Sequence, residues 1–257
     1  MILVGVSGSS KCDWQIIDGK VTVSRFSSGG LNPIFHSEEE IYKKVSSLTE
    51  LEEKNIEVIY VYSAGCGSKP LQNVLKRAFS KAYPKSNYYV NHDIVASALA
   101  TYEGTPSIAC ILGTGSNACY FDGDIVRQEV PALDYVLGDH GGGSKYGKQL
   151  LHAYLYKKLP QGLSEAFTDE YHLTKDVILE NVYMRPYPNV YLASFMHFVE
   201  KHKTHEYIQS MIQKGMEEFM DYYVLPIKKF ESVKTHFTGS IAYNFQDELK
   251  TMASMKG

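Results

Sequence analysis

Residues 113–117, Gly-Thr-Gly-Ser-Asn, are a run of small polar residues between two apolar segments. Residues 109–112 lead into this run, and a β-forming segment at 118–121 follows it, so the pattern predicts a hairpin. Hairpins usually turn on two residues, and this turn is wider. Glycines and short side chains expose backbone N–H groups to which phosphate oxygens can bind. We therefore interpret the turn as a candidate phosphate loop, in which we expect Gly115 to need open space and a positive φ.

The first twenty residues repeat this pattern. An apolar strand leads into Ser7-Gly8-Ser9-Ser10, a second strand covers 14–17, and Asp18-Gly19 forms a turn. The two hairpins lie about 107 residues apart, which predicts two halves of similar topology, with chance similarity as the alternative. Two such loops, each beginning one half of the chain, could bind one polyphosphate together.

Asp93 has the position expected of a general base. It follows the strand-like YYVN and precedes the helical IVASALA. Ligands of open α/β sheets collect at the ends of strands, and a carboxylate there could accept the proton of an attacking hydroxyl. Helix capping explains the same position equally well.

Asp139 lies in the glycine-rich segment LGDHGGGSKYGKQLL, which we interpret as a loop before a helix capped near Ser144. Its carboxylate could contact a ligand there, and simple turn formation is the alternative. Residues 142–148 also match the Gly-x4-Gly-Lys spacing of a P-loop. Gln149 stands where a P-loop needs Ser or Thr, so we reject that interpretation.

The elements between these residues predict an α/β fold with two domains. Helical spacing covers 38–54 and 70–83, and strand patterns cover 58–65 and the segment from 88 that leads into the helix after Asp93. The second half is mostly helical from 144 to 223, and 233–242 adds one strand and the start of a helix. We expect an N-terminal domain at 1–104 and a C-terminal domain at 105–257, with a final strand and helix missing.

Composition excludes some partners. A net charge of −3 supplies no basic field for nucleic acid or for an anionic membrane. No apolar run approaches the roughly 20 residues that span a bilayer, and the N-terminus lacks a signal peptide, so we expect a cytoplasmic protein.

The side chains that commonly bind metals give no clear metal site. The four cysteines form no Cys-x-x-Cys pair, and we interpret them as reduced core thiols. Cys110 and Cys119, on opposite arms of one hairpin, leave a redox or cluster-binding role open. We interpret His197, His202 and His205 as surface residues, because they do not share one helical face.

An ordered set of short motifs along the chain resembles those of a known family. The ordered motifs SGSSKCDW, GGLNP, SAGCG, NHDIVASALA, ILGTGSNACYFDG, LGDHGGGSKYGK and FTGSIA are similar to those of the BadF/BadG/BcrA/BcrD-type ATPases. Within that family the chain resembles the N-acetylglucosamine kinase-like members of the actin, sugar kinase and heat-shock ATPase superfamily. The resemblance implies two ribonuclease H-like (actin-like ATPase) domains that flank a nucleotide cleft.

The resemblance also implies roles for individual residues. ATP with Mg²⁺ would be bound by a first loop from Ser7 to Cys12 and a second loop from Gly113 to Asn117, with Gly239 and Ser240 on the adenosine side. The residues implied to bind the nucleotide are Ser7, Gly8, Ser9, Ser10, Lys11, Gly113, Thr114, Gly115, Ser116, Asn117, Gly239 and Ser240. Asp93 matches the general base. The sugar would contact Asn32, Ser63, Gly65, Asp93 and Asp139.

Two residues depart from the family pattern. Relatives usually carry an acidic residue, associated with the metal, where this chain has Val6. The usual Gly-Asp-Glu-Gly is Gly138-Asp139-His140-Gly141 here, and we expect that the histidine cannot accept sugar hydroxyls as a carboxylate does. Both changes could impair activity.

The function expected from the sequence is phosphorylation of a small sugar by ATP, with N-acetylglucosamine or a related amino sugar as the substrate and a homodimer as a candidate assembly. One alternative is a nucleotide- or sugar-binding protein with weak or no turnover. The other is an ATPase that activates a partner enzyme through a shared iron–sulfur cluster.

Overall fold

The computed structural model describes residues 1–52 and 54–256, which divide into two compact units, Met1–Ala100 and Thr101–Gly257. Two sequence predictions extend beyond the described residues. The helical segment 38–54 includes Glu53, and the C-terminal domain ends at Gly257. Each unit has its own sheet and its own buried core.

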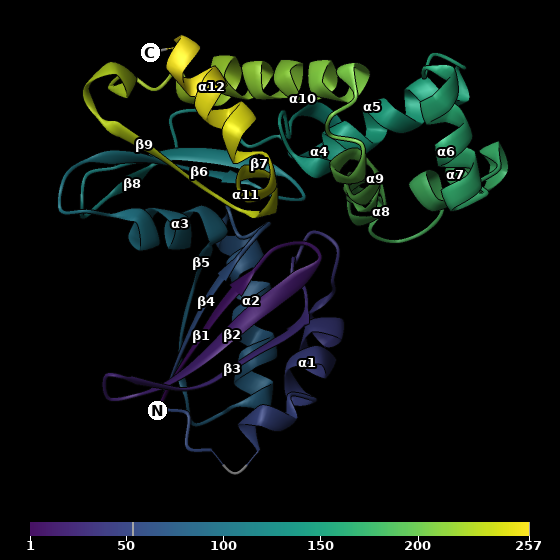
Figure 1. The fold of residues 1–257 in the computed structure, drawn as a ribbon. Helices are drawn as coiled ribbons and strands as arrows, with labels where there is room; N and C mark the ends of the chain where they lie inside the picture. Colours follow the sequence, from purple (N-terminus) through teal and green to yellow (C-terminus); the bar gives the residue numbers. More distant parts are fainter. Residues whose placement is uncertain (53, 257) are drawn as a thin grey trace. The chain divides into compact units, whose positions relative to one another are not determined.

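Unit 1 is built on a five-stranded sheet with the order β3-β2-β1-β4-β5 (Figure 1). β1 pairs antiparallel with β2 and parallel with β4, which in turn pairs parallel with β5. The elements of the first hundred residues are β1 Ile2–Ser7, β2 Lys11–Asp18, β3 Val21–Gly29, α1 Glu38–Ser46, a 3-10 turn Thr49–Leu51, β4 Val58–Ser63, α2 Lys69–Ala82, β5 Asn87–His92 and α3 Asp93–Thr101.

Helices α1 and α2 cover one face of this sheet. Ser37 and Glu40 form a capping box at the start of α1, and three glutamates in its first turn complement the helix dipole. Buried residues of both helices, such as Val45 and Phe79, join buried strand residues in one core. Trp14 of β2 belongs to this core, where its ring stacks on Phe26 with centroids 6.1 Å apart and its Nε1 donates to Ser28 Oγ at 2.8 Å.

The strand β3 was not predicted from the sequence. Residues 21–29 alternate between exposed and half-exposed side chains, because β3 is the edge strand of the sheet. Apolar and polar residues alternate only from Val21 to Ser24 before Arg25 and Phe26 interrupt the pattern, so the strand signal is short. The turn Asp18-Gly19 therefore connects β2 to β3, with Gly19 at φ 59°.

Unit 2 repeats the start of unit 1. Its four-stranded sheet has the order β8-β7-β6-β9, with β6 antiparallel to β7 and parallel to β9. The order matches β3-β2-β1-β4, which confirms the prediction of two halves with similar topology. The strands are β6 Ser107–Leu112, β7 Ser116–Phe121, β8 Val126–Arg127 and β9 Lys234–Thr238.

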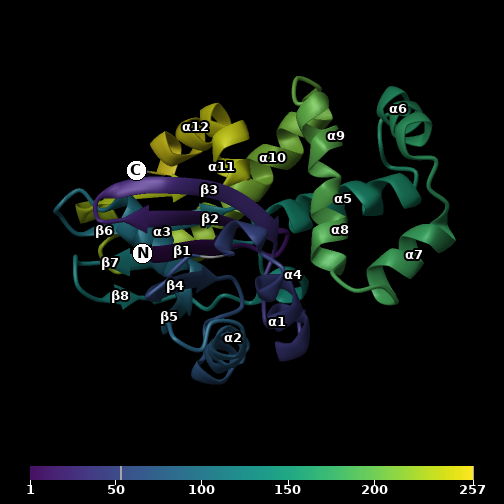
Figure 2. The ribbon, with the colours of Figure 1, turned by 90° about the horizontal axis from the view of Figure 1, so that it is seen from below.

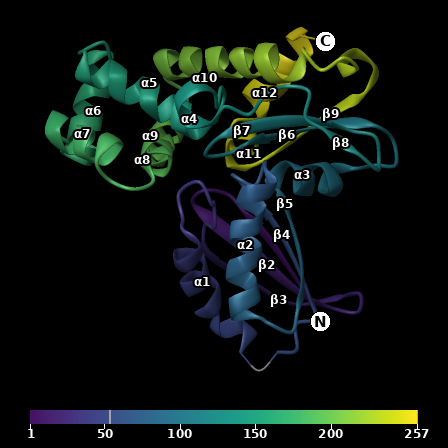
Figure 3. The same ribbon diagram turned by 180° about the vertical axis from the view of Figure 1, so that it is seen from behind.

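A long helical insertion separates β8 from β9, as the sequence indicated. After β9 the chain ends in two further helices, and α12 runs alongside α10 (Figure 3). The helical elements are α4 Asp134–Leu137, α5 Gly143–Leu155, α6 Gln161–Tyr171, α7 Lys175–Tyr183, α8 Pro188–Ser194, α9 Met196–Lys201, α10 Glu206–Phe219, a π-helical turn Met220–Val224, a 3-10 turn Phe230–Ser232, α11 Ser240–Asn244 and α12 Gln246–Lys256.

Helix α5 is central to the packing of this insertion. It crosses α8 closely (Figure 2), and a Cβ on Gly147 would lie 1.8 Å from the Leu192 carbonyl oxygen of α8. Only glycine permits such an approach. The segment 142–148 that imitated a P-loop is therefore the helix cap and first turns of α5, and Lys148 Nζ donates to the Tyr135 carbonyl at 3.0 Å. Among the described residues, none of the helices could cross a bilayer.

Candidate active site

The parallel strands of unit 1 bring three of the predicted site segments together. Ser7 at the end of β1 is paired with Ser63 at the end of β4, and Ser63 is paired with His92 at the end of β5. Asp93 follows directly as the first residue of α3. The first loop, the SAGCG segment and the candidate base therefore lie along one sheet edge, formed by the carboxyl ends of the strands, where α/β sheets bind ligands.

The first loop is a closed turn between β1 and β2. The Gly8 N–H donates to the Lys11 carbonyl at 2.9 Å, and Ser7 Oγ accepts from the Leu31 N–H at 2.8 Å. The Ser10 carbonyl accepts a hydrogen bond from the Gly30 N–H at 3.2 Å. The Lys11 side chain forms a 2.9 Å ion pair with Asp13. Backbone N–H groups of the segment that follows β3 therefore hold the loop in place.

Asn32 and Gly65 lie against each other beside this loop. Asn32 is buried, and its Nδ2 donates to Ser9 Oγ at 3.2 Å. A Cβ on Gly65 would lie 2.0 Å from Asn32 Oδ1, and Gly65 has φ 77°, so this position requires glycine twice over. Ser63 is buried too, and its Oγ donates to the Ala64 carbonyl at 3.0 Å.

Asp93 is a half-buried carboxylate with histidine and cysteine neighbours. His92 Nε2 lies 3.3 Å from Asp93 Oδ1. Burial and the charge of Asp93 raise the pKa of the Cys66 thiol to about 12, so Cys66 stays protonated. A carboxylate at a strand end and beside a histidine suits proton transfer, and its place at the start of α3 also suits a cap.

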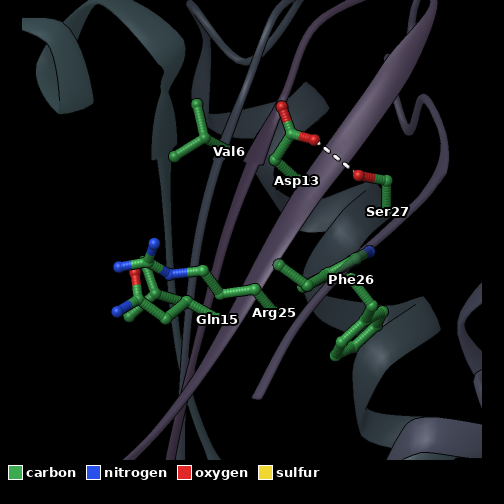
Figure 4. A pocket seen from close by; sticks show the side chains of 8 residues that line it. Val6, Asp13, Gln15, Arg25, Phe26 and Ser27 are labelled. Atoms are coloured by element: carbon green, nitrogen blue, oxygen red, sulfur yellow. Dashed lines mark hydrogen bonds between the residues drawn. The ribbon is translucent and has the colours of Figure 1, made fainter. Parts of the chain in front are cut away.

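Val6 lies on the open face of the unit 1 sheet and is 42% exposed. It lines a hollow of about 400 Å³ together with Asp13, its cross-strand partner on β2, and residues of β3 (Figure 4). Partial burial acts to raise the pKa of Asp13, but hydrogen bonds from Ser27 at 2.6 Å and from Lys11 outweigh it and lower the pKa. The hollow beside Val6 therefore already contains one ionised carboxylate.

In unit 2, the second loop packs against the first turn of α5. The Gly143 N–H donates to the Gly113 carbonyl at 2.8 Å, and the Ser144 N–H donates to the Thr114 carbonyl at 2.9 Å. The helix cap is Gly142, without a side-chain bond, so the predicted cap near Ser144 is wrong. The N–H groups at this helix start bond to loop carbonyls instead of to a capping side chain.

Asp139 closes the same loop from its other side. Its Oδ1 accepts from the Ser116 N–H at 3.0 Å, and its Oδ2 accepts from Ser144 Oγ at 3.4 Å. A Cβ on Gly115 would lie 2.7 Å from both carboxylate oxygens. Gly115 does not have a positive φ, so that part of the expectation is wrong. The Asp139 carboxylate is the reason that this position has no room for a side chain.

Three further residues predicted to bind the nucleotide, Asn117, Gly239 and Ser240, lie in or beside the second loop. Asn117 Oδ1 accepts from the Ala118 N–H and from Gln128 Nε2, both at 2.9 Å, so its side chain is used within the sheet. Gly239, with φ 103°, adjoins the loop, because a Cβ there would lie 2.3 Å from the Leu112 carbonyl oxygen. Ser240 follows as the first residue of α11.

His140 has a partner that the sequence did not indicate. Its Nδ1 lies 2.8 Å from Glu218 Oε2 on α10, and Tyr222 packs against the ring with centroids 4.7 Å apart. An ionised carboxylate only accepts hydrogen bonds, so Nδ1 donates its proton to Glu218. The expectation that this histidine cannot accept sugar hydroxyls as a carboxylate does stays a prediction. The sequence separation of 78 residues explains why no local pattern revealed the pair.

The cysteines do not form a ligand pair. Cys119 is paired with Ala109 and Cys110 with Ala118, so the two thiols point to opposite faces of the sheet. Burial raises the pKa of all four cysteines. Among residues 1–52 and 54–256, no three His, Cys, Asp or Glu side chains gather as metal ligands.

Two of the three histidines predicted to be on the surface, His202 and His205, are partly buried. His202 packs on Phe198 with ring centroids 4.3 Å apart, and burial lowers its pKa.

Comparison with solved structures places the chain in a family. A crystal structure from Porphyromonas gingivalis, named "Putative N-acetylglucosamine Kinase", is 36% identical and has a TM-score of 0.92. The alignment covers 100% of this chain and 92% of that one. The chain belongs to this N-acetylglucosamine kinase-like family. No protein-family model and no curated protein matches the sequence.

More distant structures show the fold of the N-acetylglucosamine kinase-like family. A protein of the same name from Chromobacterium violaceum is 14% identical, with a TM-score of 0.76 over 96% of this chain and 90% of that one. A ROK family glucokinase from Streptomyces griseus is 13% identical, with a TM-score of 0.55 over 98% and 89%. The predicted α/β fold with two actin-like ATPase domains is thereby confirmed.

Proposed function

We propose that this protein phosphorylates a small sugar with ATP, and that the sugar is N-acetylglucosamine or a related amino sugar. The observation that carries the proposal is the register that aligns Ser7, Ser63 and His92 at one sheet edge, with Asp93 next in the chain. The names of the relatives from P. gingivalis and C. violaceum support the same substrate class. We also propose that the chain is a member of the BadF/BadG/BcrA/BcrD-type ATPases.

Asp93 acts as the general base. The sugar hydroxyl oxygen attacks the γ-phosphorus of ATP, the bond to the bridging β–γ oxygen breaks, and ADP leaves. The hydroxyl proton passes to the Asp93 carboxylate. Asn32, Ser63 and Gly65 hold the sugar at the strand ends, and Asp139 contributes from the second loop. Positioning by these groups supplies most of the rate enhancement.

Nucleotide binding uses the two glycine-rich loops, with Gly239 and Ser240 on the adenosine side. The analogue AMPPNP is bound in the S. griseus glucokinase, which shares the fold. Mg²⁺ arrives with ATP, since Mg²⁺ is commonly held by phosphate oxygens plus one or two carboxylates. Asp13 is the carboxylate that lies across from Val6, but Lys11 and Ser27 already satisfy it. Asp13 would therefore be a poor ligand for Mg²⁺, which the phosphate oxygens of ATP would hold instead.

Val6 favours one alternative, a binding protein with weak turnover. An apolar residue stands where the family resemblance implies a carboxylate near the metal, and it is exposed to the hollow. The third possibility, an activator that shares an iron–sulfur cluster, gains nothing from the arrangement of the cysteines.

The test is sugar-dependent ADP formation by the purified full-length protein with ATP and Mg²⁺. A panel should contain N-acetylglucosamine, N-acetylmannosamine, glucosamine and glucose, with the phosphorylated product identified by mass spectrometry. We expect turnover with an N-acetylated amino sugar. Binding of sugar and ATP without product would support the binding protein, and ADP release independent of sugar would support the activator.

A further inference from the structure

Asn32 is held in a single orientation by three contacts. Its Nδ2 donates to Ser9 Oγ at 3.2 Å, its Oδ1 accepts from the Ile34 N–H at 2.9 Å, and Gly65 packs against Oδ1. Rotation of the amide by 180° would face two donors toward each other at Ile34. One buried side chain therefore joins the first loop to the SAGCG segment.

His36 fixes the backbone of Asn32. Both the N–H and Nδ1 of His36 lie 3.0 Å from the Asn32 carbonyl oxygen. A carbonyl only accepts hydrogen bonds, so Nδ1 carries the proton and the lone pair of Nε2 can accept one. The Lys44 ammonium contacts Nε2 and donates to it. His36 is buried, so this ring has one tautomer and one orientation.

Lys44 also holds the other end of the same segment. Its Nζ donates to the Gly30 carbonyl at 2.8 Å. A Cβ on Gly30 would lie 2.5 Å from the Ser9 carbonyl oxygen, so the two loops touch through their backbones. Burial lowers the pKa of Lys44, and burial together with the Lys44 charge lowers the pKa of His36, which favours a neutral His36 ring.

We propose that His36 and Lys44 are positioning residues that fix the segment Gly30–Asn32, so that the sugar-binding amide and the first phosphate loop are set in place together. The inference rests on the proposed function, since it assigns Asn32 to the sugar and Ser9 to the nucleotide. Losing the Lys44 bonds frees both ends of the segment, so the affinities for sugar and for nucleotide should fall together.

The experiment compares Lys44→Met, Lys44→Arg and the exposed neighbour Lys43→Met in the full-length protein. Calorimetry measures the dissociation constants of N-acetylglucosamine and of AMPPNP, and kinetics separates KM from kcat. Loss of hydrogen bonds to a charged group should raise both dissociation constants about tenfold in Lys44→Met, with a smaller change in kcat. Lys44→Arg keeps the donors and should stay within about threefold of the parent, as should Lys43→Met.

Nuclear magnetic resonance of the histidine ring nitrogens provides a readout independent of activity. We expect the His36 signal of a ring protonated at Nδ1 only, with an Nε2 shift that changes in Lys44→Met. A proton on Nε2, or equal affinities in Lys44→Met and Lys43→Met, overturns the inference. If Lys44→Met does not fold, His36→Asn decides, since its shorter side chain keeps a donor for the Asn32 carbonyl but has no atom at the Nε2 position to accept from Lys44. If the parent phosphorylates no sugar, the proposed function fails while the ring signal still tests the positioning pair.

Discussion

Replacing Gly115 by alanine tests whether the close contact with Asp139 constrains the second loop. The new Cβ would lie 2.7 Å from both Asp139 oxygens, whereas ordinary contacts begin at 3.4 Å. The carboxylate must therefore move by about 0.7 Å, which stretches its 3.0 Å bond from the Ser116 N–H to about 3.7 Å. A hydrogen bond to a charged group contributes about 1.5–3 kcal/mol. We expect Gly115→Ala to lower the free energy of unfolding of unit 2 by that amount.

The same displacement should weaken nucleotide binding. About 1.4 kcal/mol corresponds to a tenfold change in dissociation constant, so we expect calorimetry to show ATP affinity reduced about tenfold or more. Gly113→Ala is the matched control, because a Cβ there meets nothing within 4 Å and the residue does not have a positive φ. Urea unfolding followed by circular dichroism measures the stability of both variants. If Gly115→Ala matches Gly113→Ala in stability and ATP affinity, the Asp139 contact does not constrain the loop.

Three further substitutions test the site and the packing. Asp93→Asn should reduce sugar phosphorylation by about 10²–10⁴ in kcat with ATP affinity nearly unchanged, and activity within a few-fold of the parent would exclude a general base there. Val6→Asp places a second carboxylate opposite Asp13, so we expect a lower melting temperature without Mg²⁺, a partial recovery with it, and a steeper dependence of ADP formation on Mg²⁺. A melting temperature that does not respond to Mg²⁺ would show that Asp13 and the introduced carboxylate do not bind the ion together. Gly147→Ala should destabilise by several kcal/mol because its Cβ would lie 1.8 Å from a carbonyl of α8, whereas Gly162→Ala, in open space on α6, should stabilise by about 0.5–1 kcal/mol in thermal melts.

Local chemistry accounts for the parts of the fold that the sequence predicted. The helical spacing of residues 70–83, the glycine turns and the apolar runs of β1 and β6 are local patterns, so each can be recognised without its surroundings. The repeat of the two hairpins extended this reasoning to the topology of both sheets. Asp93 could be placed at the start of a helix for the same reason.

The contacts that decide the site could not be predicted, because they join distant segments. Asp139 bonds to the Ser116 N–H 23 residues away, and His140 meets Glu218 78 residues away. The helix start at Gly143 uses loop carbonyls instead of a serine cap, which no capping rule anticipates. Such pairings arise from packing, so they appear only once the helices around α5 are in place.

Trp14 is the one tryptophan of the chain, and it is buried in the core of unit 1 beside Phe26. Selective excitation of indole fluorescence therefore gives an optical signal from the first hundred residues alone, whereas circular dichroism records both units. Comparing the two signals during denaturation would resolve whether the halves melt independently or as one cooperative body. The chain thus contains its own spectroscopic label, and neither a dye nor an engineered residue is needed.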